Sequence, residues 1–311
     1  MLLHRVPEAE QGRYDPLGPR FDEKKQLAMK PLENRRATFA KLHESGCFVI
    51  PNPWDIGTAR FLQHLGFKAL ATTSAGFQFT RGQADTVWGM SRDAVLTHVS
   101  EIVAATDLPV NADFQSGYAH DPESVAVNVG LCVDTGVAGL SIEDATGNRD
   151  RPLYDLPLAV QRIAAARAAI DAKGAQVLLT ARAESYLVGH PEPLQDAIQR
   201  LTAYAEVGAD VLFAPGARTR EEFRAIVQAV SPKPVNAIVM GDLGFTVADL
   251  AELGVRRISV GSALARTAWG GFIQAARAIV ERGSFEGLHG ATPFAELNRV
   301  FAAADLAQPS L

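Results

Sequence analysis

Cysteines and long apolar runs are scarce in this sequence. Only two of its 311 residues are cysteines, Cys47 and Cys132, which excludes a disulfide framework and a cysteine-ligated zinc cluster. No stretch of about 18 uninterrupted apolar residues is present, so the sequence predicts no membrane span. The first residues are charged and lack the apolar core of a secretory signal, and we therefore expect a cytoplasmic location.

Charge of one sign is not concentrated in any segment. The 30 Lys and Arg residues are scattered and are outnumbered by 35 Asp and Glu residues, for a formal net charge of -5. We therefore expect neither a nucleic-acid groove nor a polybasic membrane anchor. With 47% hydrophobic and 21% charged residues, the composition is typical of a globular protein with a large core. The expected partner is a small molecule.

Short apolar runs alternate with amphipathic stretches along most of the chain. The runs are rich in β-branched and small residues without polar alternation, which is typical of strands buried on both faces of a parallel sheet. Eight such units predict a (β/α)8 barrel of the TIM type. The alternative is a doubly wound sheet, but Pro51-Asn-Pro-Trp-Asp stands where that fold usually has a glycine-rich turn. The predicted strands are Cys47–Ile50, Ala69–Thr73, Val110–Asp113, Gly139–Glu143, Val177–Ala181, Val211–Ala214, Val235–Val239 and Arg257–Val260, and the predicted helices are 55–65, 91–106, 121–135, 157–172, 193–207, 219–229, 246–252 and 263–281.

The barrel accounts for most of the chain as one domain. Residues 1–36 are polar and aperiodic, so we interpret them as an N-terminal extension, followed by the catalytic barrel over 37–290 and a C-terminal tail over 291–311.

The carboxyl ends of barrel strands form the active site of such folds. Asp113 ends the third predicted strand and Glu143 the fourth, with Asp144 next to it. Their oxygens are hard ligands that suit Mg²⁺ or Mn²⁺. Arg182 follows the fifth strand, and its guanidinium can hold a carboxylate or phosphonate through two hydrogen bonds. The alternative is that these acids pair with Arg182 in a polar layer.

Other chemistries lack their residues at the strand ends. No lysine lies there for a Schiff base, and the two cysteines fall at a strand start and inside a helix. Proton donors must then come from loops, and we predict Tyr186 and His190 after the fifth strand. The polar loop 145–156 is long enough to form a lid, or is an ordinary surface loop.

Four segments carry a family resemblance. They are Phe67-Lys-Ala-Leu-Ala-Thr-Thr-Ser-Ala-Gly, Pro109-Val-Asn-Ala-Asp-Phe-Gln-Ser-Gly-Tyr, Ser141-Ile-Glu-Asp and Thr180-Ala-Arg-Ala-Glu. In this order, over about residues 35–285, the chain resembles the isocitrate lyase / phosphoenolpyruvate mutase superfamily. The resemblance implies a (β/α)8 barrel, Mg²⁺, a small carboxylate substrate, and a homodimer or homotetramer. In such oligomers the last helix, here after Ala263 to about Leu288, is often exchanged between subunits.

The resemblance also implies roles for single residues. Arg182 matches the arginine that binds substrate, and Asp85 matches a catalytic acid near the metal cluster. Asn111 stands where the family has its first metal-site aspartate, which lowers the negative charge of the site by one. The remaining matches are Asp113 and Glu143 as metal ligands and Thr73, Ser74 and Asn236 as contacts of the substrate.

Two loops depart from well-known members of the superfamily. Ala145-Thr-Gly-Asn-Arg-Asp-Arg replaces the cysteine loop of the lyases, and also lacks the lysine of the phosphonate enzymes. Ala214-Pro215 stands where the latter carry a histidine. We predict a Mg²⁺-dependent lyase that cleaves or forms a C–C bond next to a 2-oxo or 2-hydroxy carboxylate through a metal-stabilised enolate. The alternatives are a C–P bond enzyme, such as a phosphonomutase or phosphonopyruvate hydrolase, and a non-catalytic barrel that binds a carboxylate.

Overall fold

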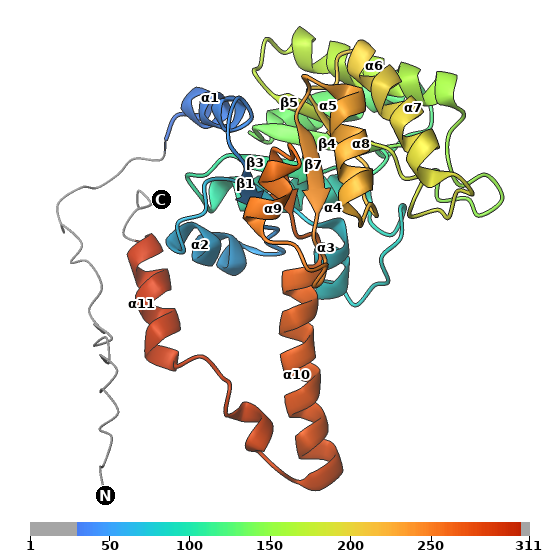
Figure 1. Ribbon diagram of the computed structural model, residues 1–311. Helices are drawn as coiled ribbons and strands as arrows, with labels where there is room; N and C mark the ends of the chain where they lie inside the picture. Colours follow the sequence, from blue (N-terminus) through green and yellow to red (C-terminus); the bar gives the residue numbers. More distant parts are fainter. Residues whose placement is uncertain (1–29, 306–311) are drawn as a thin grey trace, which may run out of the picture.

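The computed structural model describes residues 30–305, apart from the side chains of residues 303–305 (Figure 1). Eight strands form one sheet in the order β1-β8-β7-β6-β5-β4-β3-β2, and every pair is parallel. The (β/α)8 barrel prediction is therefore confirmed. The strands are β1 (Phe48–Ile50), β2 (Leu70–Ala71), β3 (Val110–Asp113), β4 (Gly139–Glu143), β5 (Leu178–Arg182), β6 (Val211–Phe213), β7 (Val235–Ile238) and β8 (Arg257–Ser259).

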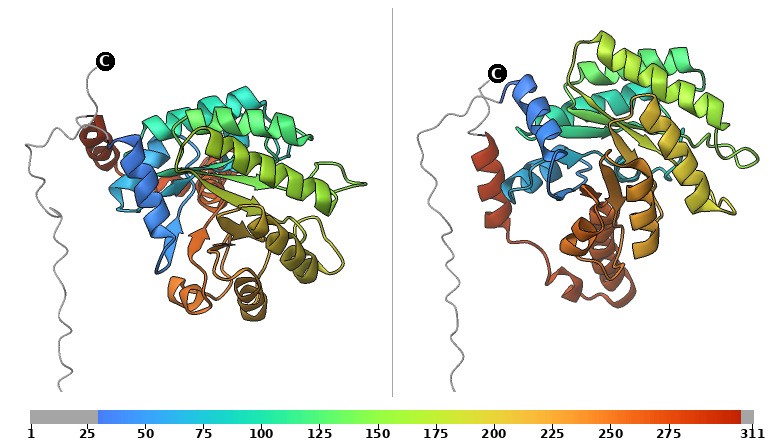
Figure 2. Two further views of the ribbon diagram at one scale, coloured as in Figure 1. Left: turned by 90° about the horizontal axis from the view of Figure 1, so that it is seen from above. Right: turned by 45° about the horizontal axis from the view of Figure 1, so that its top comes forward.

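Helices surround the strands (Figure 2). The eight predicted helices are present, and their ends lie within two residues of the predicted ones. Three more, α1, α3 and α11, were not predicted. The helices are α1 (Leu32–Leu42), α2 (Ile56–His64), α3 (Ser74–Thr80), α4 (Arg92–Ala104), α5 (Pro122–Asp134), α6 (Leu156–Ala172), α7 (Pro193–Glu206), α8 (Arg220–Val230), α9 (Val247–Glu252), α10 (Ala263–Arg282) and α11 (Phe294–Asp305), with a 3-10 turn η1 (Glu286–Leu288).

The barrel closes between β1 and β2 without a regular strand pair. The backbone N–H of Ala71 donates to the carbonyl of Pro51 at 3.0 Å. Asn52 completes the closure with its side chain, since Nδ2 donates to the carbonyl of Thr72 at 3.0 Å and Oδ1 accepts the N–H groups of Val260 and Gly261 at 3.0 and 2.9 Å. One buried amide thus joins the ends of β1, β2 and β8.

The amino end of the barrel is filled by α1. Phe39 is fully buried and clusters with Ile50, Ala69, Ala71 and Ala138 from the strands and their lead-in turns. A larger apolar core lies between the strands and the outer helices. Because one end is plugged, the cavity of the barrel lies at its carboxyl end.

The C-terminal arm departs from the barrel. Helix α10 follows β8 and projects away from the strands, and the chain then returns so that α11 lies beside α2 (Figure 1). Helix α1 crosses the predicted boundary at residue 36, and α11 occupies most of the predicted tail. Residues 1–29 of the predicted extension lie outside the described residues. Between residues 30 and 305, no helix combines the length and hydrophobicity needed to cross a membrane.

Candidate active site

A cavity of about 230 Å³ with both polar and apolar lining residues lies at the carboxyl ends of the strands. Many of its lining residues were not among the predicted site residues, including Ser141, Arg257, Ser259, Gly261, Leu187 and Met240. The predicted residues that do line it are Thr73, Ser74, Asp85, Asn111, Asp113, Arg182 and Asn236.

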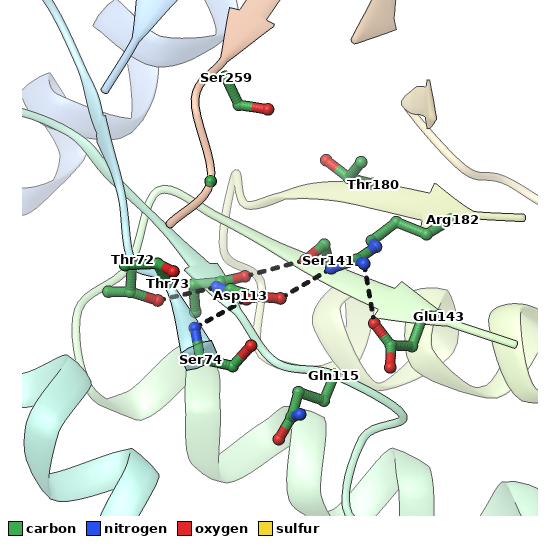
Figure 3. A network of polar contacts seen from close by, with 12 residues as sticks. Thr72, Thr73, Ser74, Asp113, Gln115, Ser141, Glu143, Thr180, Arg182 and Ser259 are labelled. Atoms are coloured by element: carbon green, nitrogen blue, oxygen red, sulfur yellow. Dashed lines mark hydrogen bonds and ion pairs between the residues drawn. The ribbon is translucent and has the colours of Figure 1, made fainter. Parts of the chain in front are cut away.

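Arg182 joins the acidic residues of three strand ends, and Figure 3 shows its contacts with Asp113 and Glu143. Its Nη1 donates to Oδ1 of Asp113 at 2.9 Å, and its Nη2 contacts Glu143 at 3.1 Å and Glu184 at 2.8 Å. The other oxygen of Asp113 accepts the backbone N–H of Ser74 at 2.9 Å. The polar-layer alternative is therefore present in the structure, where Arg182 is ion-paired with three carboxylates.

One guanidinium does not balance this acidic group. Burial raises the pKa of Glu143 to about 8, an effect that the neighbouring Arg182 only partly offsets. Burial likewise raises the pKa of Glu184. At Asp85, burial and the negative charge of Asp113 both raise the pKa. Carboxyl groups gathered in a buried place resist ionisation unless cations offset them, so the site favours an additional cation.

The chemistry of these side chains fits Mg²⁺. Asp113, Glu143, Asp85 and Asn111 offer only oxygen and amide donors, the type that Mg²⁺ prefers. Asn111 supports this assignment because its Oδ1 is buried and has no hydrogen-bond partner. The described residues nevertheless contain no group of three His, Cys, Asp or Glu side chains arranged around a single metal position. Water molecules would complete the coordination, as is usual for Mg²⁺.

Asp144 faces a different environment from Glu143. It accepts the hydroxyl of Tyr204 at 2.6 Å, Nη1 of Arg200 at 3.2 Å and the backbone N–H of Glu184 at 2.9 Å. Asp144 is therefore held by α7 and fixes the loop after β5, and it is not among the residues that line the cavity.

Two predicted substrate contacts are held in place by neighbours. Thr73 is the N-cap of α3 and accepts the N–H of Gly76 at 3.2 Å. Asn236 accepts Nε of Arg257 at 2.7 Å and donates to the hydroxyl of Ser259 at 3.0 Å. Both side chains are at most 3% exposed.

Tyr186 and His190 are not among the residues that line the cavity. Tyr186 packs against Gly216, and burial together with the negative charge of Glu222 raises its pKa. His190 accepts the N–H of Glu192 through Nδ1 at 3.2 Å. Their catalytic roles stay predictions.

The loop after β4 is tied to its surroundings. Ala145 and Leu153 form an isolated antiparallel bridge, and the indole N–H of Trp88 donates to the carbonyl of Thr146 at 2.9 Å. Trp88 belongs to the segment after α3 that also carries Asp85. The lid function of this loop stays a prediction.

Comparison with known proteins identifies the family. The model of the phosphoenolpyruvate phosphomutase family matches residues 39–280. The chain belongs to this family. An uncharacterized Mycobacterium tuberculosis protein is 32% identical over 84% of this chain and 94% of its own length. A Corynebacterium glutamicum protein named as a probable 2-methylisocitrate lyase is 29% identical over 82% of this chain and 84% of its own.

Solved structures agree with this assignment. A Burkholderia cenocepacia protein assigned only as a lyase or mutase has 46% identity and a TM-score of 0.84, with 89% of this chain and 98% of that chain covered. The structure of 2,3-dimethylmalate lyase, described as a member of the PEP mutase/isocitrate lyase superfamily, has 26% identity and a TM-score of 0.76 over 88% of this chain and 95% of its own. The predicted superfamily is therefore confirmed.

Proposed function

We propose that the protein is a Mg²⁺-dependent lyase that cleaves or forms a C–C bond next to the carboxylate of a 2-oxo or 2-hydroxy acid. The observation that carries this proposal is the set of three carboxylates around Arg182. Their negative charge exceeds the single positive charge of Arg182, so the site can accept a cation next to a bound substrate carboxylate. The relatives named for 2-methylisocitrate and 2,3-dimethylmalate cleavage support the C–C choice.

Each proposed site residue has a part, and all of them line the cavity except Glu143, which contacts Arg182. Arg182 binds the substrate carboxylate, and the start of α3, with Thr73 and Ser74, holds its oxygens. Mg²⁺, or Mn²⁺ in its place, would be held by Asp113 and Glu143 with Asn111 beside them, and would stabilise negative charge that develops on the substrate. Asp85 lines the cavity and has a raised pKa, so we assign proton transfer to it.

The test is turnover of a panel of acids by the full chain. We expect 2-methylisocitrate, 2,3-dimethylmalate or a related acid to be cleaved in Mg²⁺ and not in excess chelator, with the products followed by proton NMR. Asp113→Asn keeps the side-chain shape and removes the charge, and should lower kcat/KM at least ~100-fold. Asp171→Asn, at an exposed residue in the last turn of α6, is the matched control.

Two results would contradict the proposal. Release of phosphate from phosphonopyruvate, with no C–C cleavage on the panel, would assign the C–P alternative. Metal-independent binding of carboxylates without turnover would assign the binding barrel.

We also propose that the chain acts as a homodimer or homotetramer in the cytoplasm. Helix α10 supports the oligomer, because Trp269, Phe272, Ile273, Ile279 and Val280 on this helix are all exposed in the single chain. An apolar surface of this extent on a projecting helix is typical of an interface.

A further inference from the structure

One arginine inside the barrel has no anionic partner. Arg257 begins β8, its side chain lines the cavity, and it is only 3% exposed. It lies across the barrel from Arg182, since β6 and β7 separate the two strands. In the described part of the chain, no carboxylate lies within 4.0 Å of its guanidinium.

The partners of Arg257 are neutral side chains. Nε donates to Oδ1 of Asn236 at 2.7 Å, Nη2 donates to the hydroxyl of Thr180 at 3.0 Å, and Nη1 lies 3.4 Å from Nε2 of His43. Nδ1 of His43 is 2.8 Å from the carbonyl of Phe39 and must donate to it, so Nε2 is an acceptor. Burial and the charge of Arg257 lower the pKa of His43 to about 3, which keeps this ring neutral.

Two other buried arginines have backbone carbonyl partners that Arg257 lacks. Arg162 donates to the carbonyls of Ser116, Ala119 and His120, and Arg35 donates to two carbonyls near the end of α4. Arg257 has neither carbonyl nor carboxylate partners among the described residues. Each of its three nitrogens has one neutral partner, so these contacts use three of the five N–H groups of the guanidinium.

A buried cation without a counter-charge is unfavourable. Burial alone lowers the pKa of Arg257 to about 9, with no carboxylate to offset it. A shorter or neutral side chain at this position would avoid the cost of burying a charge. The charge of Arg257 instead lies on the wall of a cavity that a small molecule can enter. The carboxylates that line the cavity come from β3 and the segment after α3, so the cavity is acidic on one side and basic on the other.

We propose that Arg257 binds a second anionic group, a carboxylate at the far end of the substrate from the one held by Arg182. Asn236 and Ser259 line the cavity beside it and offer further hydrogen bonds to this group. The inference rests on the proposed function for the orientation of the substrate, and it narrows the substrate class to acids with two separated carboxylates. A free oxyanion such as phosphate would make the same contacts with Arg257 and is the alternative occupant of this subsite.

Matched ligand pairs test the subsite. The first pair is malate and 2-hydroxybutanoate, which differ by a carboxylate in place of a methyl group, and the second is 2-hydroxyglutarate and 2-hydroxypentanoate. Calorimetric titration of the full chain, in Mg²⁺ and at one ionic strength, should show at least ~30-fold tighter binding of the dicarboxylate in one pair, as expected for a buried charge pair. Equal affinities in both pairs would overturn the inference while leaving the proposed function in place.

Variants of Arg257 test whether this residue causes the preference for the dicarboxylate. Because Arg257 also holds Asn236 through Nε at 2.7 Å, the quantity compared is the ratio of the two affinities within each ligand pair. Arg257→Met should bring this ratio to about one, and Arg257→Lys, which keeps a cation, should retain part of the preference. Arg256→Met is the control, because Arg256 carries the same charge one residue earlier but donates to the carbonyl of Gly46 and does not line the cavity. A preference that survives in Arg257→Met overturns the inference.

Titration with inorganic phosphate distinguishes a subsite for a substrate carboxylate from a subsite for a free oxyanion. If no hydroxy acid binds but phosphate raises the melting temperature of the wild type and not of Arg257→Met, the anion subsite stands and the proposed function loses its support. If neither phosphate nor any dicarboxylate binds, the inference is wrong.

Discussion

Arg182 and Arg257 both line the cavity, but their hydrogen-bond and ion-pair partners differ. The guanidinium of Arg182 contacts three carboxylates, so those acids can approach one another without full repulsion. Arg257 contacts only neutral side chains, so its charge is left for a ligand. The two arginines therefore differ in their partners: Arg182 holds the acids of the site together, whereas no carboxylate among the described residues offsets the charge of Arg257.

His98 supports the element that carries Ser74. Its ring stacks on Phe77 of α3 with centroids 3.9 Å apart, and its Nε2 is buried without a partner. Burial, with the positive charge of Arg81 as a smaller cause, lowers the pKa of His98 to about 4. The ring is therefore neutral in the folded protein at neutral pH.

We predict that acid destabilises the fold partly through His98. Between pH 6.5 and about 4 the unfolded chain binds a proton that the folded one does not, so stability falls as the pH falls, by up to ~3 kcal/mol from this residue. His98→Phe keeps the stacked ring and should lower the slope of unfolding free energy against pH near pH 5 by about 1.4 kcal/mol per unit. Urea unfolding at several pH values measures this. His289→Gln, at an exposed residue, is the control, and an unchanged slope in His98→Phe would contradict the prediction.

Sequence patterns located some site residues and missed others. Asp113, Glu143 and Arg182 end predicted strands, so the carboxyl-end rule of barrels could bring them together. The sequence did not predict Arg257 as a site residue, because Arg256 and Arg257 are adjacent charged residues at the start of a strand and the pattern does not show which of them faces the cavity. Only the alternation of side chains in β8 places one of them outside and the other in the cavity. The pairing of Asp144 with α7 depends on long-range packing and was equally hidden.

At the scale of elements, the strands and helices of the barrel were predictable to within two residues. Their periodicity and glycine stops are local properties. Helix α3 was missed because its seven residues, SAGFQFT, are too short to show a helical repeat. Helix α1 was missed because it has few apolar positions from which to read a period. Helix α11 does carry Phe294, Leu297 and Val300 at helical spacing, but it lies beyond the eighth predicted unit, in the segment interpreted as a tail.

The β1–β2 closure is the element whose loss is most easily tested. We predict that Asn52→Ala lowers the free energy of unfolding by about 3 kcal/mol, because it leaves the N–H groups of Val260 and Gly261 and the carbonyl of Thr72 without partners. Denaturant unfolding measures the change. Asn148→Ala, in an exposed loop, is the control and should have little effect. Equal stability of Asn52→Ala and wild type would contradict this account of the closure.

At the scale of the whole molecule, α10 starts against the barrel, where Ala265 is buried, and then projects away from it (Figure 1). Phe272 is 62% exposed and Val280 81% exposed. Burial of such side chains contributes about 1.5–3 kcal/mol each, which favours association of chains through this helix.

We predict that Phe272→Glu with Val280→Glu converts the oligomer into monomers. Light scattering coupled to size-exclusion chromatography should show a dimer or tetramer for the wild type and one chain mass for the double variant. Val127→Glu, on α5 and similarly exposed at 63%, is the control and should leave the mass unchanged. A monomeric wild type at micromolar concentration would contradict the proposal.

The turn before α10 links this helix to the cavity. Asn52 holds the N–H of Gly261, Gly261 and Ser262 line the cavity, and α10 begins at the next residue. Any tilt of α10 on association with another chain therefore moves a wall of the cavity. If the proposed oligomer forms through α10, we predict that specific activity changes as the protein is diluted.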